Sequence, residues 1–332
     1  MDPQPQPAIP LLVLVGPTAT GKTALALALA ERLRGELPGR PSDAPTLEAV
    51  SADSRQIYRL MDIATAKPTP AERARLPHHL LDVVWPDESY TLAQYQADAN
   101  AAIAEIAGRG ALPLLVGGTG LYVRAVVDGL AIPAVAPAPE LRAELEAEAA
   151  AHGPEALHAR LAALDPDAAA RIAPRNTRRL IRALEVTLLT GRPFSAQQGR
   201  RPTPYRPLLI GLNMDRAALY ARAAARIEAM LAAGLVEETR TLVARGYDWT
   251  LPAMSSLGYR EIGAYLRGEL TLEAAVERFA LATHAYIRRQ LTWFRSDTRI
   301  HWLDAAGIHR TPLLPEALAE AALAHIRPWL AG

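Results

Sequence analysis

The chain has 332 residues, 50% of them hydrophobic, a formal net charge of +1 and no cysteine. This length and apolar content allow one large domain, or a domain with an insertion, built around a hydrophobic core. The lack of cysteine excludes a disulfide framework and a thiolate metal site, and it fits a reducing cytoplasm. No apolar run approaches the ~20 residues of a membrane helix, so we expect no membrane partner. Residues 1–10 are Pro-rich and lack the features of a signal peptide, and we expect them to form a disordered leader.

The first motif is a phosphate-binding loop between a strand and a helix. An apolar run at residues 11–15 predicts a buried strand, and residues 24–33 predict a helix. Between them the sequence matches G-x-x-x-x-G-K-[ST] at Gly16, Pro17, Thr18, Ala19, Thr20, Gly21, Lys22 and Thr23. In such a loop backbone N–H groups face an anion, the lysine adds a positive charge and the threonine can hold Mg²⁺. The motif predicts a polyphosphate ligand, but kinases, ATPases and enzymes that never use ATP share it.

Further strands alternate with helices up to about residue 132. Apolar runs lead into residues 51–54 and 117–119, a third covers 78–84, and a helix is predicted at 91–107. The alternation predicts an α/β fold, a P-loop NTPase-like parallel sheet flanked by helices, with ligands at the carboxyl ends of the strands. Asp53 and Thr119 are therefore candidate site residues. The run before Thr119 ends in Gly-Gly-Thr-Gly instead of the acid of a motor ATPase, which disfavours chemistry driven by ATP hydrolysis.

A Pro-rich junction near residue 132 opens a different pattern. Residues 133–205 are Ala-rich and helical, and they predict an all-helical insertion domain. A strand then returns at residues 207–212, and Asp215 is placed to cap a helix. Amphipathic helices follow, the longest at 272–295. The predicted core domain therefore consists of residues 11–132 and 206–332.

Charge and residue usage pick out two further features. From residue 171 to 206 the chain has nine arginines and one acid, Glu185, a local charge of 9 − 1 = +8. Such a block either holds a polyanion or forms a solvated helix surface, and charge alone does not separate the two. Lysine occurs only at Lys22 and Lys67, so Lys67 has a site role or remains by chance. Asp53 fits a magnesium ligand, a general base or a helix cap.

Six stretches together carry a resemblance to a known family. They are GPTATGKT, SADSRQIYRLMDIATAKP, PHHLLDV, LLVGGTGLYVRAVVDGL, RIAPRNTRRLIRALEV and MSSLGYRE, in this order, between residues 11 and 295. In this order and spacing the chain resembles the tRNA dimethylallyltransferases, the bacterial tRNA prenyltransferases. Ala64 stands where the family usually has glycine before TAKP.

The resemblance implies a reaction and roles for single residues. The family transfers a dimethylallyl group from dimethylallyl diphosphate to the exocyclic amine of the adenosine next to the anticodon. The phosphate loop would hold the leaving diphosphate, with Mg²⁺ near Thr23. By the same resemblance Thr119 contacts the bridging oxygen, Arg240 and Arg142 add positive charge, and Asp53 is the general base.

The family pattern also implies a tRNA surface that grips the anticodon stem-loop. Within it the aromatic ring of Tyr259 would either stack on a base or pack in the core. A cytoplasmic monomer is expected. Adenylate isopentenyltransferases and P-loop small-molecule kinases are the alternatives, and the helical insertion favours tRNA over both. The implied tRNA-binding residues are Asp53, Ser54, Arg55, Gln56, Arg178, Arg179, Leu180, Ile181, Arg182, Ser255, Ser256, Leu257, Gly258, Tyr259 and Arg260.

Overall fold

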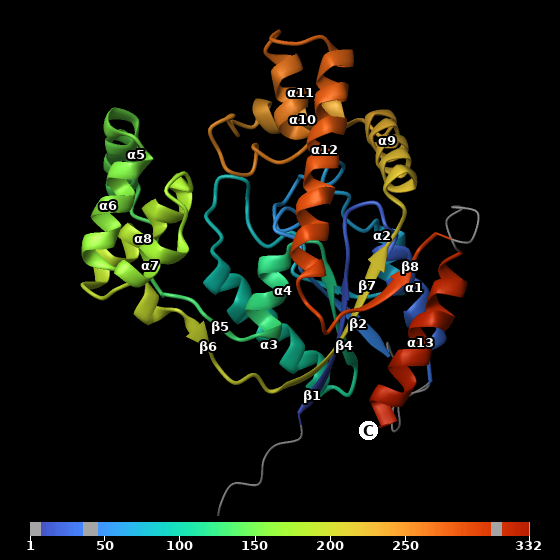
Figure 1. Ribbon diagram of the computed structural model, residues 1–332. Coiled ribbons are helices and arrows are strands. Elements are labelled where there is room, and N and C mark those ends of the chain that lie inside the picture. Colours follow the sequence, from blue (N-terminus) through green and yellow to red (C-terminus); the bar gives the residue numbers. More distant parts are fainter. Residues whose placement is uncertain (1–7, 36–45, 307–313, 332) are drawn as a thin grey trace, which may run out of the picture. The chain divides into compact units, whose positions relative to one another are not determined.

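The computed structural model describes residues 8–35, 46–306 and 314–331 and divides the chain into two compact units (Figure 1). Unit 1 comprises Met1–Val123 and Pro204–Gly332, and unit 2 comprises Arg124–Thr203. Along the chain, unit 2 is therefore an insertion into unit 1. Within the described residues no helix is long and apolar enough to cross a membrane.

Unit 1 is built on a six-stranded parallel sheet. Val15 at the end of β1 lies in register with Gly117 of β4 and Gly211 of β7, so the segments that follow these strands leave the sheet at one edge. The phosphate loop is one of these segments. In the order β3-β2-β4-β1-β7-β8, the strands are His78–His79, Leu47–Ser51, Leu112–Gly117, Ile9–Val15, Tyr205–Asn213 and His301–Asp304.

Helices cover both faces of this sheet (Figure 1). Helices α1 and α13 pack on one face with the apolar side chains of β1 and β7, and α3 lies on the other face. A second apolar core joins residues 57–61 to α9, α10, α11 and α12. The helices are α1 (Lys22–Arg32), α2 (Pro70–Arg75), α3 (Leu92–Gly108), α4 (Gly120–Val127, which crosses the boundary between the units), α9 (Arg216–Ala232), α10 (Leu235–Ala244), α11 (Tyr259–Leu266), α12 (Leu272–Arg295) and α13 (Pro315–Ala331).

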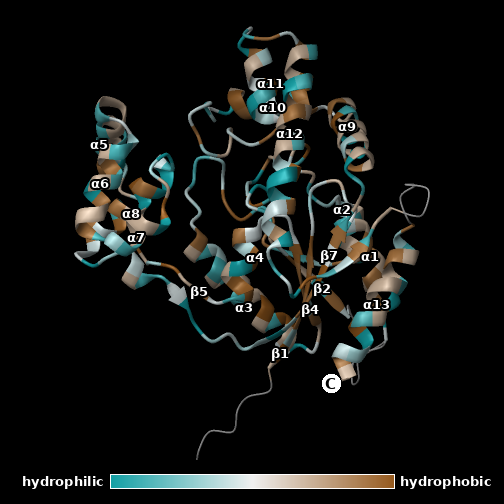
Figure 2. Ribbon diagram, in the orientation of Figure 1, coloured by the Kyte–Doolittle hydropathy of each residue, from teal (hydrophilic) through white to brown (hydrophobic). Residues whose placement is uncertain are grey.

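Local sequence explains where several of these helices begin. Thr91 and Gln94 form a capping box at the start of α3, because each side chain satisfies a backbone N–H of the other residue. The carboxylate of Asp215 accepts hydrogen bonds from the first N–H groups of α9, as the sequence predicts, and Thr271 caps α12. Apolar residues of α1, α3 and α13 then pack against the strands of the sheet, which are brown in Figure 2.

Unit 2 is mainly helical. Its core consists of leucines and other apolar residues from all four of its helices. The carboxylate of Glu185, whose side chain is fully buried, accepts hydrogen bonds from Arg142, Arg182 and the backbone N–H of Ala138. Burial raises the pKa of Glu185, but these donors outweigh it and lower the pKa to about 2. The helices are α5 (Pro139–His152), α6 (Pro154–Leu164), α7 (Pro166–Arg171) and α8 (Thr177–Thr190).

Several features differ from the sequence-based expectation. Residues 9 and 10, assigned to the leader, belong to β1, and residues 1–7 lie outside the described residues. The predicted third strand is only two residues long, His78–His79. Strand β8 and helix α13 were not predicted at all. In unit 2 a short antiparallel pair joins β5 (Leu130–Ala131) to β6 (Gly199–Arg200), and only β6 falls in the segment 133–205 that was expected to be helical.

Candidate active site

The phosphate loop runs from the end of β1 to the start of α1. Gly16 has φ +145°, and a Cβ atom there would lie 2.7 Å from the carbonyl oxygen of Leu212, so only glycine fits this close approach to β7. Gly21, with φ +96°, begins α1, and within the described structure no side chain caps this helix. The first N–H groups of α1 can therefore serve an anion, as the motif predicts.

Lys22 lies inside this loop. Its Nζ donates hydrogen bonds to the carbonyl oxygens of Gly16 and Pro17, at 2.9 and 2.8 Å. Burial and the nearby charge of Arg226 lower the pKa of Lys22 to about 8, and the charge of Asp53 opposes this. A cation held against a second cation creates a site where an anion is strongly favoured.

Two arginines of α9 complete this positive region. The Nη1 of Arg226 donates to the hydroxyl of Thr18 at 3.3 Å, and Arg222 and Arg226 line the same cavity as Lys22. Burial lowers the pKa of Arg226, and Asp53 opposes that shift. Our sequence interpretation missed both residues. The available signal was their spacing of four, which places them on one face of the helix that follows β7 at the ligand edge of the sheet.

One cavity of about 810 Å³ brings most of the predicted residues together. Its volume lies within the range of small-molecule sites. Its wall comes from the phosphate loop, the segments after β2 and β4, α9, residues 255–260 and α12. The functional side chains and loop residues on it are Thr18, Ala19, Gly21, Lys22, Thr23, Asp53, Ser54, Arg55, Gln56, Lys67, Gly117, Gly118, Arg222, Arg226, Ser255, Ser256, Leu257, Arg260, Thr283, Tyr286, Arg289 and Gln290.

Asp53 lies at the end of β2, beside the turn that follows β4. Its Oδ1 accepts a hydrogen bond from the backbone N–H of Arg55 at 2.8 Å, which forms a local turn. No helix follows directly, because the next one begins at Pro70, so the helix-cap interpretation is wrong. The remaining Oδ2 has no hydrogen bond to another described residue and shares the cavity with Lys22 and Thr23.

The turn after β4 packs closely against the segment that follows β2. A Cβ atom on Gly117 would lie 2.2 Å from the carbonyl oxygen of Ala52, so no other residue fits there. Thr119 donates its backbone N–H to the same oxygen at 3.1 Å, and its hydroxyl accepts the N–H of Ser54 at 3.1 Å. These contacts place the Thr119 hydroxyl next to the Asp53 turn, as the strand-end rule predicts.

Helix α12 joins this turn to the phosphate loop through Gln290, which is 5% exposed. Its Oε1 accepts the backbone N–H of Thr18 at 2.9 Å, and its Nε2 donates to the carbonyl oxygen of Gly118 at 2.9 Å. A Cβ atom on Gly118 would lie 2.2 Å from that Nε2. One buried amide thus fixes the spacing of the two loops.

The predicted segment 255–260 divides into two groups. Four of its residues line the cavity, whereas Gly258 and Tyr259 are not part of its wall as the described structure defines it. Tyr259 is fully buried, and its hydroxyl donates to Glu238 at 2.5 Å. Of the two roles considered for its ring, the geometry shows packing. Gly258 has φ +90° and faces Ala64, the departure from the family pattern, because a Cβ atom on Gly258 would lie 2.7 Å from that of Ala64.

The geometry does not support the predicted roles of Arg240 and Arg142. Arg240 projects from α10, forms an ion pair with Glu237 and is absent from the cavity wall formed by the described residues. The positive charge expected from Arg240 beside the phosphate loop is supplied by Arg226. Arg142 belongs to unit 2, where its Nε and Nη2 donate to Glu185 at 2.6 and 2.8 Å. Its guanidinium therefore holds α5 to α8.

The basic block of unit 2 also separates into two kinds of residue. Leu180 and Ile181 are core residues, and Arg182 is tied to Glu185. Arg178 and Arg179 are exposed in the first turn of α8. Cations in the first turn of a helix oppose its dipole, so these two arginines do not serve helix stability. Like the other exposed arginines of the block, Arg171, Arg175, Arg192, Arg200 and Arg201, they can meet a polyanion.

The donor groups fit a magnesium ion better than a transition metal. Across the described residues no group of three or more His, Asp or Glu side chains converges on one point. Mg²⁺ needs few protein ligands, because it keeps several waters and binds phosphate oxygens. Thr23 and Asp53 both line the cavity that contains the phosphate loop. This donor set suits Mg²⁺.

Comparisons with known proteins identify relatives of this chain. A family model described as IPP transferase matches residues 56–297. A tRNA dimethylallyltransferase of Chloroflexus aurantiacus is 58% identical over 285 residues, covering 86% of this chain and 92% of the relative. One from Roseiflexus castenholzii is 58% identical over 297 residues, covering 90% and 93%.

Solved structures extend the similarity to the fold. The full-length tRNA isopentenylpyrophosphate transferase of Bacillus halodurans matches with a TM-score of 0.69 and 39% identity, over 97% of both chains. A eukaryotic dimethylallyltransferase acting on tRNA matches with a TM-score of 0.80 at 24% identity, over 98% of this chain and 80% of that one. At that identity the second match bears on the fold alone.

Proposed function

This chain belongs to the IPP transferase family, and on that premise we propose that its cavity transfers a dimethylallyl group from dimethylallyl diphosphate to tRNA. The acceptor is the N6 amine of the adenosine on the 3′ side of the anticodon, and diphosphate is released. One observation carries the proposal: a phosphate loop and a carboxylate, Asp53, share a cavity large enough for an allylic diphosphate and a base. The named relatives agree with this activity, and not with prenylation of free adenylate or with a kinase.

The donor side of the cavity stabilises the leaving group. Breaking the bond between the allylic carbon and the diphosphate oxygen leaves the electron pair on diphosphate. The N–H groups of the phosphate loop, Lys22 and Arg226 converge where this charge develops. We assign the contact with the bridging oxygen to Thr119, whose hydroxyl lies beside the Asp53 turn, although Thr119 is not part of the cavity wall formed by the described residues. Mg²⁺ held by the Thr23 hydroxyl would supply further charge stabilisation.

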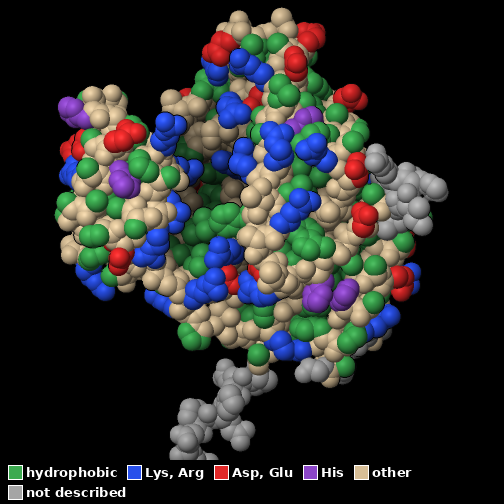
Figure 3. Space-filling model, viewed as in Figure 1, with side chains coloured by type: hydrophobic (Ala, Val, Ile, Leu, Met, Phe, Trp, Pro, Cys, Tyr) green, Lys and Arg blue, Asp and Glu red, His purple; other side chains and the backbone are tan. Residues whose placement is uncertain are grey.

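The acceptor side removes a proton. The adenosine N6 forms the new C–N bond, and its proton passes to the carboxylate of Asp53. The target base must turn out of the anticodon loop to reach the cavity, which costs a few kcal/mol. Contacts to tRNA phosphates supply that energy. Exposed arginines, among them Arg288 and Arg289, serve this purpose on α12, where Figure 3 shows Lys and Arg side chains (blue). On unit 2 we assign the role to Arg178 and Arg179. With tRNA as its substrate, the enzyme works in the cytoplasm.

Mass spectrometry tests this function directly. The purified chain is incubated with Mg²⁺ and dimethylallyl diphosphate, with unmodified tRNA or AMP offered in parallel. Adenosine with one added prenyl group is expected in tRNA only. Product in AMP only would replace the proposal with the adenylate activity, and ATP consumption without prenyl transfer would favour a kinase.

Replacing Asp53 with asparagine separates chemistry from binding. The amide keeps the size of the side chain but cannot accept a proton, so kcat should fall by about 10²–10⁴-fold. The tRNA Kd should change little, which a filter-binding titration measures. Near-normal turnover of Asp53→Asn would remove Asp53 from the proton transfer.

A further inference from the structure

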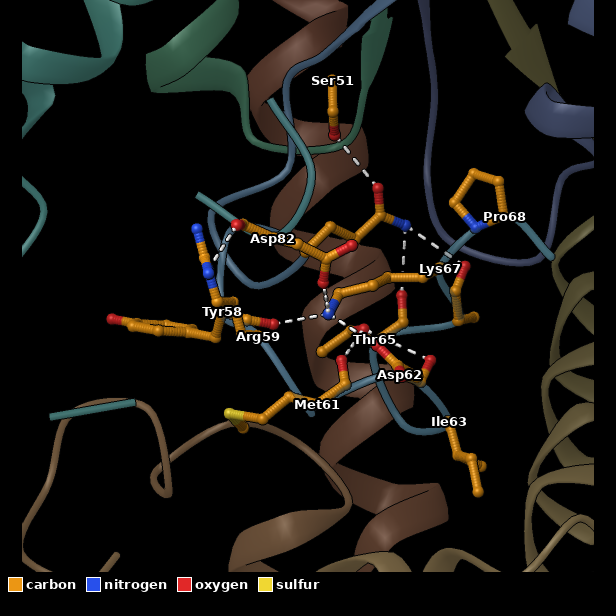
Figure 4. Close-up of polar contacts among 12 residues, drawn as sticks. Ser51, Tyr58, Arg59, Met61, Asp62, Ile63, Thr65, Lys67, Pro68 and Asp82 are labelled. Atoms are coloured by element: carbon orange, nitrogen blue, oxygen red, sulfur yellow. Dashed lines mark hydrogen bonds and ion pairs between the residues drawn. The ribbon is translucent and has the colours of Figure 1, made fainter. Parts of the chain in front are cut away.

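Lys67 occupies a buried cluster that the proposed chemistry does not use (Figure 4). Its side chain is 2% exposed. Nζ donates to the carbonyl oxygen of Tyr58 at 2.5 Å, to Asp62 at 2.7 Å and to Asp82 at 2.6 Å. An ammonium group has three N–H donors, and all three are used here.

This geometry accounts for a lysine in a chain whose other cations, Lys22 excepted, are arginines. The three acceptors come from three points of the chain and surround a single atom. A guanidinium is planar and presents its donors in a fork, so it cannot meet three acceptors around one centre. Burial raises the pKa of Asp82, but hydrogen bonds from Lys67 and Arg73 outweigh it and hold that pKa below its ordinary value.

The cluster fastens the segment that forms one wall of the cavity. Residues 64–68 line the cavity, and Lys67 is one of them. The amide of Gln56 donates to the carbonyl oxygens of Thr65 and Ala66, both at 3.2 Å, and accepts from the Ser51 hydroxyl at 3.0 Å (Figure 4). Ala66 is therefore held by Gln56, which bonds its carbonyl oxygen, and by the cluster around the next residue, Lys67.

The backbone around the cluster is strained, so something must hold it. Leu60, Ala66 and Asp82 have φ of +65°, +48° and +55° although none is glycine. Each such residue costs about 1–2 kcal/mol, and it persists only where its surroundings fix it. Lys67 bonds to Asp82 itself and to Tyr58 and Asp62, which lie two residues before and after Leu60, and it follows Ala66 directly in the chain, which makes it the common support of the wall.

We propose that Lys67 is a positioning residue for the acceptor side of the cavity: it holds the wall 64–68 beside Asp53 and Gln56 so that the adenine is seated for attack. The inference rests on the proposed prenyl transfer to tRNA. A change at Lys67 should affect the acceptor side of the site and not the donor side. The diphosphate on the donor side is held by the phosphate loop and α9, which Lys67 does not contact.

The test compares substitutions of Lys67 by two separate measurements. Lys67→Arg keeps the charge and changes its geometry, and Lys67→Met removes the charge at similar length. Both should lower kcat/KM for tRNA by about 10–100-fold. The Kd of inorganic pyrophosphate with Mg²⁺, measured by calorimetry, should stay within about twofold, because its site is untouched. Arg59→Met is the matched control: Arg59 also bonds Asp82, but from the exposed side. It should leave both values unchanged.

The outcomes are distinct. If the Lys67 variants do not fold, Asp62→Asn, which removes the negative charge of one acceptor at an exposed position, gives a milder loss with the same split. Wild-type kcat/KM in Lys67→Arg overturns the inference, and so does an equal loss of tRNA turnover and pyrophosphate affinity. Absence of prenyl transfer by the unmodified chain would overturn the proposed function instead.

Discussion

Lys22 is held where its surroundings oppose its charge. Burial and Arg226 lower its pKa to about 8, and the negative charge of Asp53 only partly compensates. A bound diphosphate reverses this balance, because the anion favours the charged ammonium. Binding should therefore be coupled to protonation of this one residue.

The coupling predicts a pH dependence. As pH rises through about 8, the unliganded protein loses the Lys22 proton. Pyrophosphate affinity should then fall by up to about tenfold per pH unit. Calorimetry from pH 7 to 9.5 in buffers of different ionisation enthalpy measures both the affinity and the proton uptake. Lys22→Met, which cannot titrate, corrects for the titration of the ligand itself. Equal slopes in the two proteins would contradict the prediction.

Residue roles could be predicted from sequence only where chemistry and chain position coincide. Lys22 and Thr23 were singled out because they belong to the phosphate-loop motif, and Asp53 because it follows the strand Leu47–Ser51. Arg226 was missed because its contact with Thr18 depends on how α9 returns across the phosphate loop. Arg240, two turns into another helix, received a role by resemblance, and its side chain is committed to Glu237 at the surface.

At the scale of elements, α12 sets the geometry of the loops. Gln290 bonds Thr18 of the phosphate loop and Gly118 of the β4 turn, so both donor binding and chemistry depend on it. Gln290→Met keeps the volume and removes two buried hydrogen bonds. We expect the pyrophosphate Kd to rise about tenfold, which corresponds to about 1.4 kcal/mol, and kcat to fall as well.

The control lies on the same helix. Thr292 is exposed, and its hydroxyl bonds the Arg288 carbonyl within the helix. Thr292→Ala should leave both parameters unchanged. A Gln290→Met enzyme with normal pyrophosphate affinity would show that the phosphate loop keeps its shape without α12.

Some elements could be predicted almost to the residue and others not at all. The helix Leu272–Arg295 was found with its bounds, because its amphipathic pattern is long and starts after a capping threonine. The strand at 78–84 was overestimated, since Leu80 and Asp82 have φ of +62° and +55° and leave the sheet. Strand β8 has only four residues, with little apolar pattern of its own. It forms by pairing with β7, a contact between distant parts of the chain that the local sequence pattern does not indicate.

At the scale of the whole molecule, tRNA binding should depend on arginines of unit 2 that are exposed, and not on those that hold Glu185. Arg178 and Arg179 are exposed, whereas Arg142 and Arg182 hold Glu185. The double variant Arg178→Ala/Arg179→Ala should weaken tRNA binding and reduce the slope of log K against log salt by about 2 at most. Filter binding across a salt series measures this.

A surface charge elsewhere in unit 2 provides the comparison. Arg160 is exposed and paired with Glu148. Arg160→Ala should not change the slope. If the double variant has an unaltered slope, the block is a solvated helix surface, the other interpretation of its charge. The +8 count in the sequence could not make this distinction, because it does not show which arginines are occupied inside the unit.

The scarcity of lysine has a practical consequence. Apart from its α-amino group, the chain has two primary amines, and Lys67 is enclosed by its three acceptors. Lys22 faces the cavity, and its lowered pKa makes it nucleophilic near neutral pH. An amine-reactive reagent should therefore label one side chain selectively. No cysteine competes for the reagent. The rate at which Lys22 is modified should therefore measure what fraction of the phosphate loops is occupied by a bound anion.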